Sequence, residues 1–278
     1  MGCFDFSKEK DYLICIDSDG CAMDTMNVKH IRCFGPEWIK TFGLEEYETE
    51  ALEYWNKINL YSGTRGINRF KGLALGLLEM ERRGVMIEGL DDFVRWTEET
   101  KELSNPSLLA QCQKVRSNCM ELALLWSIHV NLSITELPRL DKPFPNVKTA
   151  MADMKQWADL VAVSSANGQA VEEEWMKHDL KGHTKALLSQ EVGSKAFCIA
   201  KLLEKGYSPE KVCMVGDAPG DRDAAYANQV WFYPIVVGKE GESWRKLREE
   251  VFPRLLAGDF DEAYQRELMV PFNEALGI

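Results

Sequence analysis

Two pairs of acidic residues each follow a short apolar run. Asp17 and Asp19 come directly after YLICI, and Asp217 and Asp221 come after VCMV and a glycine. A short apolar run that ends in turn residues is typical of a buried parallel strand that leads into a loop. Because ligands of open parallel sheets bind beyond the carboxyl ends of the strands, we expect the four carboxylates to converge at one edge of a sheet.

A hydroxyl pair and a lysine belong to the same pattern. Ser164 and Ser165 follow the apolar run LVAV, and Lys195 comes just inside a helix that Ser194 is placed to cap. Hydroxyl and ammonium groups at the carboxyl edge of a sheet are suited to hold the oxygens of a phosphoryl group. We expect the first hydroxyl after the strand, Ser164, to be the one that does so, with Ser165 as the alternative.

Four carboxylates within a few ångströms of one another repel, so the cluster needs a cation. Carboxylate ligands together with substrate phosphate are typical of Mg²⁺. In such a site one carboxylate attacks phosphorus and forms an aspartyl phosphate. An acid two residues away can protonate the leaving oxygen.

These segments resemble the four motifs of the haloacid dehalogenase-like (HAD) phosphohydrolases. DSDG at 17–20 is similar to the D-x-D-G motif, and the apolar strand ending in Ser164 is similar to the second motif. Lys195, in GSKA, matches the third-motif lysine, and GDAPGD at 216–221 matches G-D-x-x-x-D. All four occur in the family's order and cover the core strands at both ends of the chain.

The resemblance implies roles for the acids. Asp17 would be the nucleophile and a metal ligand, and Asp19 the general acid and base that binds the metal through its backbone carbonyl. Asp217 would be the third protein ligand of Mg²⁺, with Asp221 beside the ion directly or through water. The resemblance also implies that Asp19 separates this chain from the dehalogenases and phosphonatases of the family, which lack that acid.

In the same resemblance, Ser164 (or Ser165) and Lys195 bind the phosphoryl group. One departure from the family pattern is Cys21, which stands where Thr or Val is usual after D-x-D-G. A small apolar residue serves at that position, so this departure leaves the assignment unchanged.

The elements that must position these residues alternate between strands and helices, which predicts a doubly wound parallel sheet, a Rossmann-like α/β core. Between the first strand and the rest, apolar residues recur only at helical spacing, for example over 90–103 and 106–130. We therefore predict a catalytic core at 1–26 and 144–278 and an all-helical domain at 27–143. Its place matches that of the family's helical cap. The predicted strands are 12–16, 160–163, 186–189, 212–215 and 230–237.

Within the helical domain, a glycine-containing break between two helical patterns carries Arg65 and Arg69. Arginine binds carboxylate and phosphate in a bidentate manner, so these residues are candidates to recognise the non-reacting end of a substrate. The alternative is a plain helix connection with exposed arginines.

Composition narrows the class of protein. The chain has 278 residues, 45% hydrophobic and 28% charged, with a formal net charge of −11, so we expect a globular protein that does not bind nucleic acid in general. No apolar run approaches the ~20 residues that span a membrane, and the charged first eleven residues predict no secretory signal. The eight cysteines form no C-x-x-C, which favours reduced thiols and a cytoplasmic location.

We therefore expect a Mg²⁺-dependent phosphomonoester hydrolase that forms an aspartyl phosphate and acts on a small phosphorylated metabolite. A phosphomutase would use the same residues and return the phosphoryl group to the substrate. A catalytically silent binding protein is the alternative from another class, although no motif residue is missing. The oligomeric state and the identity of the substrate stay open.

Overall fold

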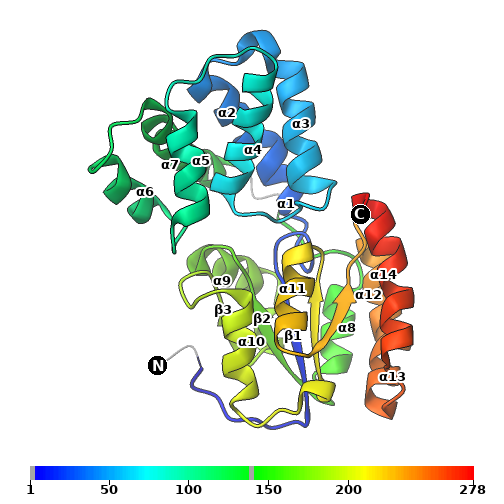
Figure 1. The fold of residues 1–278 in the computed structure, drawn as a ribbon. Coiled ribbons are helices and arrows are strands. Elements are labelled where there is room, and N and C mark those ends of the chain that lie inside the picture. Colours follow the sequence, from blue (N-terminus) through cyan, green and yellow to red (C-terminus); the bar gives the residue numbers. More distant parts are fainter. Residues whose placement is uncertain (1–3, 138–140) are drawn as a thin grey trace. The chain divides into compact units, whose positions relative to one another are not determined.

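The structure is a computed structural model that describes residues 4–137 and 141–278. Backbone contacts divide the chain into two compact units (Figure 1). Unit 1 consists of Met1–Met26 and Asp141–Ile278, and unit 2 is Asn27–Leu140. Each unit has its own hydrophobic core, so each is described separately.

The second boundary between the units differs by three residues from the predicted one at 143/144. Lys142 and Phe144 bind the first-motif segment of unit 1: the Asp24 amide donates to the Lys142 carbonyl at 2.8 Å, and the Phe144 amide donates to the Ala22 carbonyl at 3.0 Å. Because of these hydrogen bonds, the returning chain joins unit 1 at Asp141, three residues before the predicted boundary.

Unit 1 contains a five-stranded parallel sheet with the strand order β3-β2-β1-β4-β5. This confirms the predicted doubly wound α/β core. The first strand of the chain lies in the middle of the sheet, where the direction of winding reverses. The strands are β1 (Tyr12–Ile16), β2 (Ala158–Val163), β3 (Ala186–Leu188), β4 (Val212–Gly216) and β5 (Trp231–Pro234).

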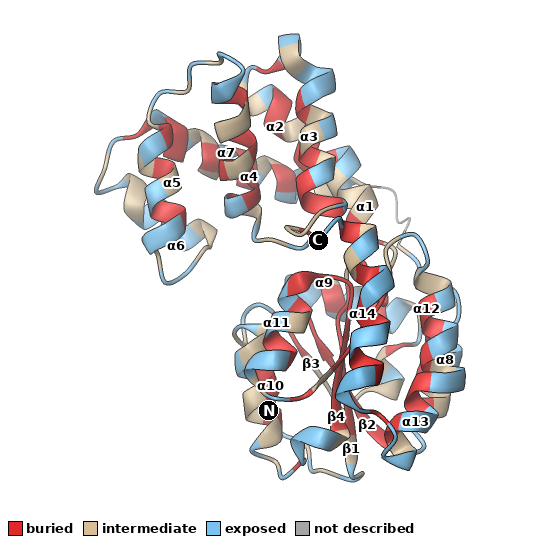
Figure 2. Cartoon of the chain, turned by 45° about the vertical axis from the view of Figure 1, so that its right-hand side comes forward, coloured by how far each residue is buried: buried red, intermediate tan, exposed pale blue. Residues whose placement is uncertain are grey.

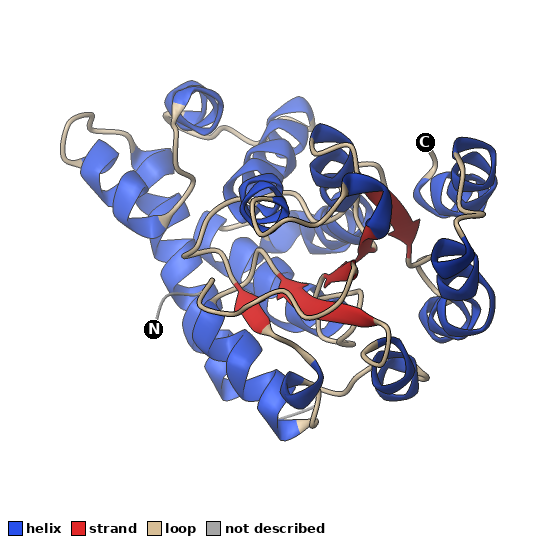
Figure 3. Cartoon of the chain, turned by 90° about the horizontal axis from the view of Figure 1, so that it is seen from below, coloured by secondary structure: helices blue, strands red, loops and turns tan. Residues whose placement is uncertain are grey.

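Helices flank the sheet (Figure 3), and their apolar residues meet the alternating faces of the strands. Leu13 and Cys15 pack in one core cluster, while Ile14 and Ile16 pack in the other. Burying an aliphatic side chain stabilises the fold by roughly 1.5–3 kcal/mol, which explains why the strands read as continuous apolar runs. Figure 2 shows the buried strands between half-exposed helices. The helices of unit 1 are α8 (Val147–Met154), α9 (Gly168–Lys177), η3 (Lys181–His183), α10 (Lys195–Leu203), η4 (Pro209–Lys211), α11 (Pro219–Ala227), α12 (Glu240–Lys246), η5 (Leu247–Val251), α13 (Phe252–Ala257) and α14 (Glu262–Leu276).

The edge strand β5 is covered by α14. The side chain of Gln265 pairs with the backbone of Phe232 as another strand would: the Phe232 amide donates to Oε1 at 3.0 Å, and Nε2 donates to the Phe232 carbonyl at 2.6 Å. This satisfies two backbone groups that a sheet edge would otherwise leave open to pairing with another chain.

In unit 2 the described residues form helices and connecting turns, as predicted. The predicted helical pattern at 106–130 is two helices, because the chain turns at 113–117 and the Ser117 hydroxyl donates to the Gly89 carbonyl at 3.1 Å. Helix α1 (Met26–Lys29) spans the first boundary. The others are η1 (His30–Phe34), α2 (Gly35–Phe42), η2 (Glu45–Tyr47), α3 (Glu48–Leu60), α4 (Arg69–Arg82), α5 (Leu90–Glu99), α6 (Asn105–Cys112) and α7 (Asn118–Glu136).

Throughout the described ranges, every helix is too short or too polar to cross a membrane.

Candidate active site

The carboxyl ends of the three central strands bring the predicted residues together. Asp17 directly follows β1, Ser164 follows β2 and Asp217 follows β4. The Asp17 amide donates to the Val215 carbonyl at 3.0 Å, so the ladder between β1 and β4 continues to the first site residue. Ligands of open α/β sheets bind at this reversal of strand order.

The loop after β1 is a tight turn held by two buried tryptophans. The Trp175 indole donates to Ser18 Oγ at 2.9 Å, and the Trp244 indole donates to the Cys21 carbonyl at 2.9 Å. Gly20 has a φ of 84°, a conformation that favours glycine. Both tryptophans also belong to the buried core of unit 1, so the same two side chains pack the core and anchor the loop.

Three carboxylates and one ammonium form the centre of the site. Asp17, Asp217 and Asp221 each offer an oxygen within 4.8 Å of the others, and all three residues are buried. Lys195 Nζ lies 2.8 Å from Asp17 Oδ1 and 2.6 Å from Asp221 Oδ1. The second Asp221 oxygen accepts a hydrogen bond from the Ala218 amide at 3.1 Å.

This crowding shifts the pKa values of the site. Burial raises the pKa of the Asp17 carboxyl well above its ordinary value; Lys195 opposes that shift, and the carboxylates of Asp221 and Asp217 add to it. Burial alone would lower the pKa of Lys195, but its ion pairs with Asp17 and Asp221 raise it. The three carboxylates carry more negative charge than one ammonium neutralises, so the donor set fits a small divalent cation.

Gly216 permits the approach of Asp221. A Cβ at position 216 would lie 2.3 Å from Asp221 Cγ, far inside van der Waals contact. The glycine of the fourth motif is therefore required by packing against the carboxylate that follows it.

Asp19 lies outside the cluster of three carboxylates found among the described residues. Its Oδ1 accepts a hydrogen bond from the Thr25 hydroxyl at 2.5 Å. This contact holds a second acid beside the site, two residues from Asp17. The role of Thr25 could not be predicted from the sequence, because its hydroxyl meets Asp19 only after the loop folds back.

The structure distinguishes the two serines by burial. Ser164 is buried, its amide donates to the Leu188 carbonyl at 2.8 Å, and its Oγ accepts from the Ala166 amide at 3.1 Å. This leaves the Ser164 hydroxyl proton to donate. Ser165 is exposed. The geometry therefore favours Ser164 as the hydroxyl of the site.

The two arginines of the helical domain are held within unit 2. Arg65 Nη1 donates to the Leu60 carbonyl at 2.7 Å. Arg69 Nη1 donates to Asn131 Oδ1 at 2.7 Å, and burial lowers the pKa of Arg69 to about 10. These contacts are internal to unit 2, so substrate recognition by either arginine stays a prediction.

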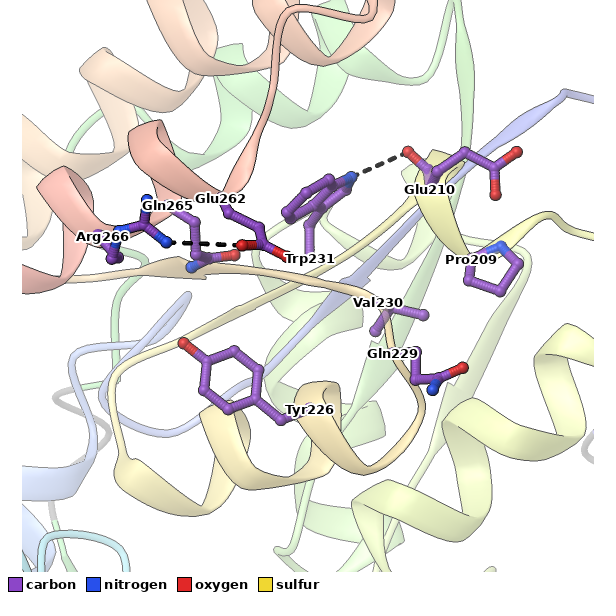
Figure 4. A pocket seen from close by; sticks show the side chains of 9 residues that line it. All are labelled: Pro209, Glu210, Tyr226, Gln229, Val230, Trp231, Glu262, Gln265 and Arg266. Atoms are coloured by element: carbon purple, nitrogen blue, oxygen red, sulfur yellow. Dashed lines mark hydrogen bonds and ion pairs between the residues drawn. The ribbon is translucent and has the colours of Figure 1, made fainter.

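A hollow of about 540 Å³ lies elsewhere on unit 1 (Figure 4). Its lining includes Tyr226, Trp231 and Arg266, and none of the predicted site residues. The lining offers no arrangement able to transfer a phosphoryl group. We therefore place the chemistry at the carboxylate cluster.

Neither a protein-family model nor a curated protein sequence matches this chain. Several solved structures are similar to it. A protein of Lactobacillus delbrueckii subsp. bulgaricus, provisionally assigned as a phosphoglycolate phosphatase, is 13% identical over 82% of this chain and 87% of its own, with a TM-score of 0.49. A provisionally assigned β-phosphoglucomutase of Thermotoga maritima is 15% identical over 86% and 99%, with a TM-score of 0.48.

A HAD-superfamily hydrolase of Geobacter sulfurreducens, subfamily IA, is 14% identical over 82% of this chain and 89% of its own, with a TM-score of 0.45. At such identities the likeness concerns the fold.

Proposed function

We propose that this protein is a Mg²⁺-dependent phosphomonoester hydrolase that acts on a small phosphorylated metabolite through an aspartyl phosphate on Asp17. One observation carries the proposal: three buried carboxylates cluster where the central strands end, and two of them, Asp17 and Asp221, pair with Lys195. Three carboxylate side chains and one ammonium leave a net negative charge, which a phosphoryl group could not approach without a cation.

Asp17 and Asp217 would hold the Mg²⁺, together with the backbone carbonyl of Asp19. Both oxygens of Asp221 already accept hydrogen bonds, from Lys195 and from the Ala218 amide. These bonds favour a role for Asp221 through an intervening water. Bound Mg²⁺ would neutralise the carboxylates and draw electron density from a phosphoryl oxygen.

The chain's own residues would carry the chemistry. An oxygen of Asp17 attacks phosphorus as the bond to the ester oxygen breaks, and Asp19 donates its proton to the leaving alkoxide. Asp19, held by Thr25, then takes a proton from a water that attacks the aspartyl phosphate. Inorganic phosphate leaves, and Asp17 is restored as a carboxylate.

Ser164 and Lys195 would hold the phosphoryl oxygens through both steps. The Lys195 ammonium is charged beside Asp17, and the Ser164 hydroxyl has a proton to donate. Groups fixed before the reaction stabilise the charge that builds on the equatorial oxygens.

The test is a screen of phosphorylated metabolites for phosphate release, with Mg²⁺ and with excess EDTA. We expect release with Mg²⁺, loss of activity in EDTA and recovery on adding back Mg²⁺. Asp17→Asn, purified in the same way, controls for contaminating phosphatases. Undiminished turnover in EDTA, or an active Asp17→Asn, would overturn the proposal. Following the products by ³¹P resonance separates a hydrolase, which releases phosphate, from a phosphomutase, which yields an isomeric ester.

A further inference from the structure

One glutamate joins two of the loops at the carboxyl edge of the sheet. Glu191 lies in the loop after β3, and its carboxylate accepts four hydrogen bonds, one of them from its neighbour Gln190 at 3.3 Å. Asn167 Nδ2 donates to Oε1 at 2.8 Å, while the Gly168 amide and Ser189 Oγ donate to Oε2 at 3.1 Å and 2.7 Å. Two of these donors belong to the loop after β2 and the start of α9. Glu191 thus connects the segment that follows Ser164 to the segment that leads to Lys195.

Backbone contacts extend this connection towards Ser164. The Gln190 amide donates to the Ala166 carbonyl at 3.1 Å, and the Ala166 amide donates to Ser164 Oγ at 3.1 Å. Ala166 alone therefore links the backbone of Gln190 to the hydroxyl of Ser164. Gly168 is also tightly placed, since a Cβ there would lie 2.6 Å from Ser189 Oγ.

On the other side, only three residues separate Glu191 from Lys195. Within them Gly193 has a φ of 144°, and a Cβ at that position would lie 2.7 Å from Phe197 Cδ1. Ser194 then caps α10 by accepting a hydrogen bond from the Phe197 amide at 3.2 Å. The turn is tightly constrained, so a shift at Glu191 would be passed on to the start of α10.

Glu191 is exposed, yet it is held as an ionised group. Burial of part of the side chain opposes ionisation, but the hydrogen bonds from Ser189 and from the Gly168 amide lower the pKa of Glu191 below its ordinary value. Hydrogen bonds to an ionised acceptor are stronger than those between neutral groups.

We propose that Glu191 is a positioning residue that sets the spacing between Ser164 and Lys195, the two groups assigned to the phosphoryl oxygens. This inference rests on the proposed function. Glu191 touches neither substrate nor metal in this assignment. It acts through the loops it joins.

The experiment compares Glu191→Ala and Glu191→Gln with the control variant Glu173→Ala. Glu173 is an exposed glutamate of helix α9, and its side chain accepts a hydrogen bond from Gln169 of that helix. Affinity for inorganic phosphate is measured by calorimetry in Mg²⁺, alongside KM and kcat for the best ester. For Glu191→Ala we expect phosphate affinity about tenfold weaker and KM higher by a similar factor, equivalent to about 1.4 kcal/mol. We expect kcat to change less, since Asp17 and Asp19 keep their places. Glu191→Gln, which retains one acceptor oxygen, is expected to lie between.

Hydrogen exchange at 164–170 gives a readout independent of activity: these amides should exchange faster in Glu191→Ala than in Glu173→Ala. If Glu191→Ala lowers thermal stability while phosphate affinity and KM match those of Glu173→Ala, Glu191 is only structural and the inference is wrong. A wild type that turns over no ester and binds no phosphate would instead overturn the proposed function, and the inference with it. A wild type that binds phosphate without turnover would overturn the hydrolase alone, and the affinity comparison would still decide the role of Glu191.

Discussion

The carboxylates of Asp17 and Asp19 lie two residues apart, but they have different neighbours. Asp17 is buried beside Lys195, whereas Asp19 accepts a hydrogen bond from Thr25. We expect Asp17→Asn never to acquire a phosphoryl group, because it has no nucleophilic oxygen anion. Asp19→Asn should do so slowly, with a loss of about 10²–10⁴-fold that is smallest for esters with good leaving groups. The amount of phosphoryl label that stays on each variant after acid quenching measures both outcomes. A labelled Asp17→Asn would mean that the nucleophile is another residue.

Crowding at Asp17 also predicts how stability depends on pH. Its pKa in the folded protein is raised above the ordinary 3.8 by burial, and the carboxylates of Asp221 and Asp217 add to the shift. Above that ordinary value the folded state therefore holds more protons than the unfolded state, so metal-free protein loses stability as the pH rises through the raised pKa.

Mg²⁺ should offset this loss. We expect the gain in Tm on replacing EDTA by Mg²⁺ to be larger at about pH 8 than at about pH 5. Asp217→Asn, which removes one of the clustered charges, should be more stable than wild type in EDTA and gain less from Mg²⁺. An equal gain at both pH values would show that the carboxylates do not repel one another in the folded protein.

At the scale of single elements, the end of β4 depends on a glycine. In Gly216→Ala the new Cβ would collide with Asp221, whose oxygens bind Lys195 and the Ala218 amide. We expect this variant to lose about 10²-fold in kcat/KM, the order measured when one preorganised electrostatic contact is removed, and to bind Mg²⁺ more weakly. Gly220→Ala is the matched control, because a Cβ there meets nothing within 4 Å. Equal activity of the two variants would show that Asp221 can move without consequence.

The pairing of α14 with the edge strand predicts a change in stability without a change in chemistry. Gln265→Leu leaves the amide and carbonyl of Phe232 without their partners at a covered edge, which should cost roughly 2 kcal/mol of folding free energy. Gln169→Ala, on the exposed face of α9, should cost less than about 0.5 kcal/mol. Denaturant titration measures both, and kcat per folded molecule should stay at the wild-type level. If Gln265→Leu is as stable as the wild type, water or another group forms hydrogen bonds with the amide and carbonyl of Phe232.

The strands were predictable because each is a short apolar run, and three of them, β1, β2 and β4, end directly before a residue of the site. β1 has its predicted bounds, whereas β5 ends at Pro234 and not at 237, because β4 offers partners only as far as Gly216. The helices after β5 were not predicted. Nor could Thr25 and Glu191 be found, because their partners come together only through the folding of loops.

At the scale of the whole molecule, the two units keep separate apolar cores. The clusters that pack on the two faces of the sheet contain only residues of unit 1, and the aromatic cluster around Trp38, Trp55 and Trp126 contains only residues of unit 2. All four carboxylates of the site belong to unit 1. A cation bound there should therefore stabilise one unit directly and leave the other's core unchanged.

Hydrogen exchange with and without Mg²⁺ tests this separation. We expect Mg²⁺ to slow exchange at the ends of β1 and β4 and across the sheet of unit 1, because ligand binding stabilises the unit that holds the ligand. Exchange in helices α4 and α7, which contribute buried residues to the core of unit 2, should stay the same. Asp217→Asn provides the control, since it should abolish the protection while leaving the exchange of unit 2 as in wild type. Equal protection of both units by Mg²⁺ would mean that they unfold as one cooperative body, and the two cores would then have to be treated as energetically coupled.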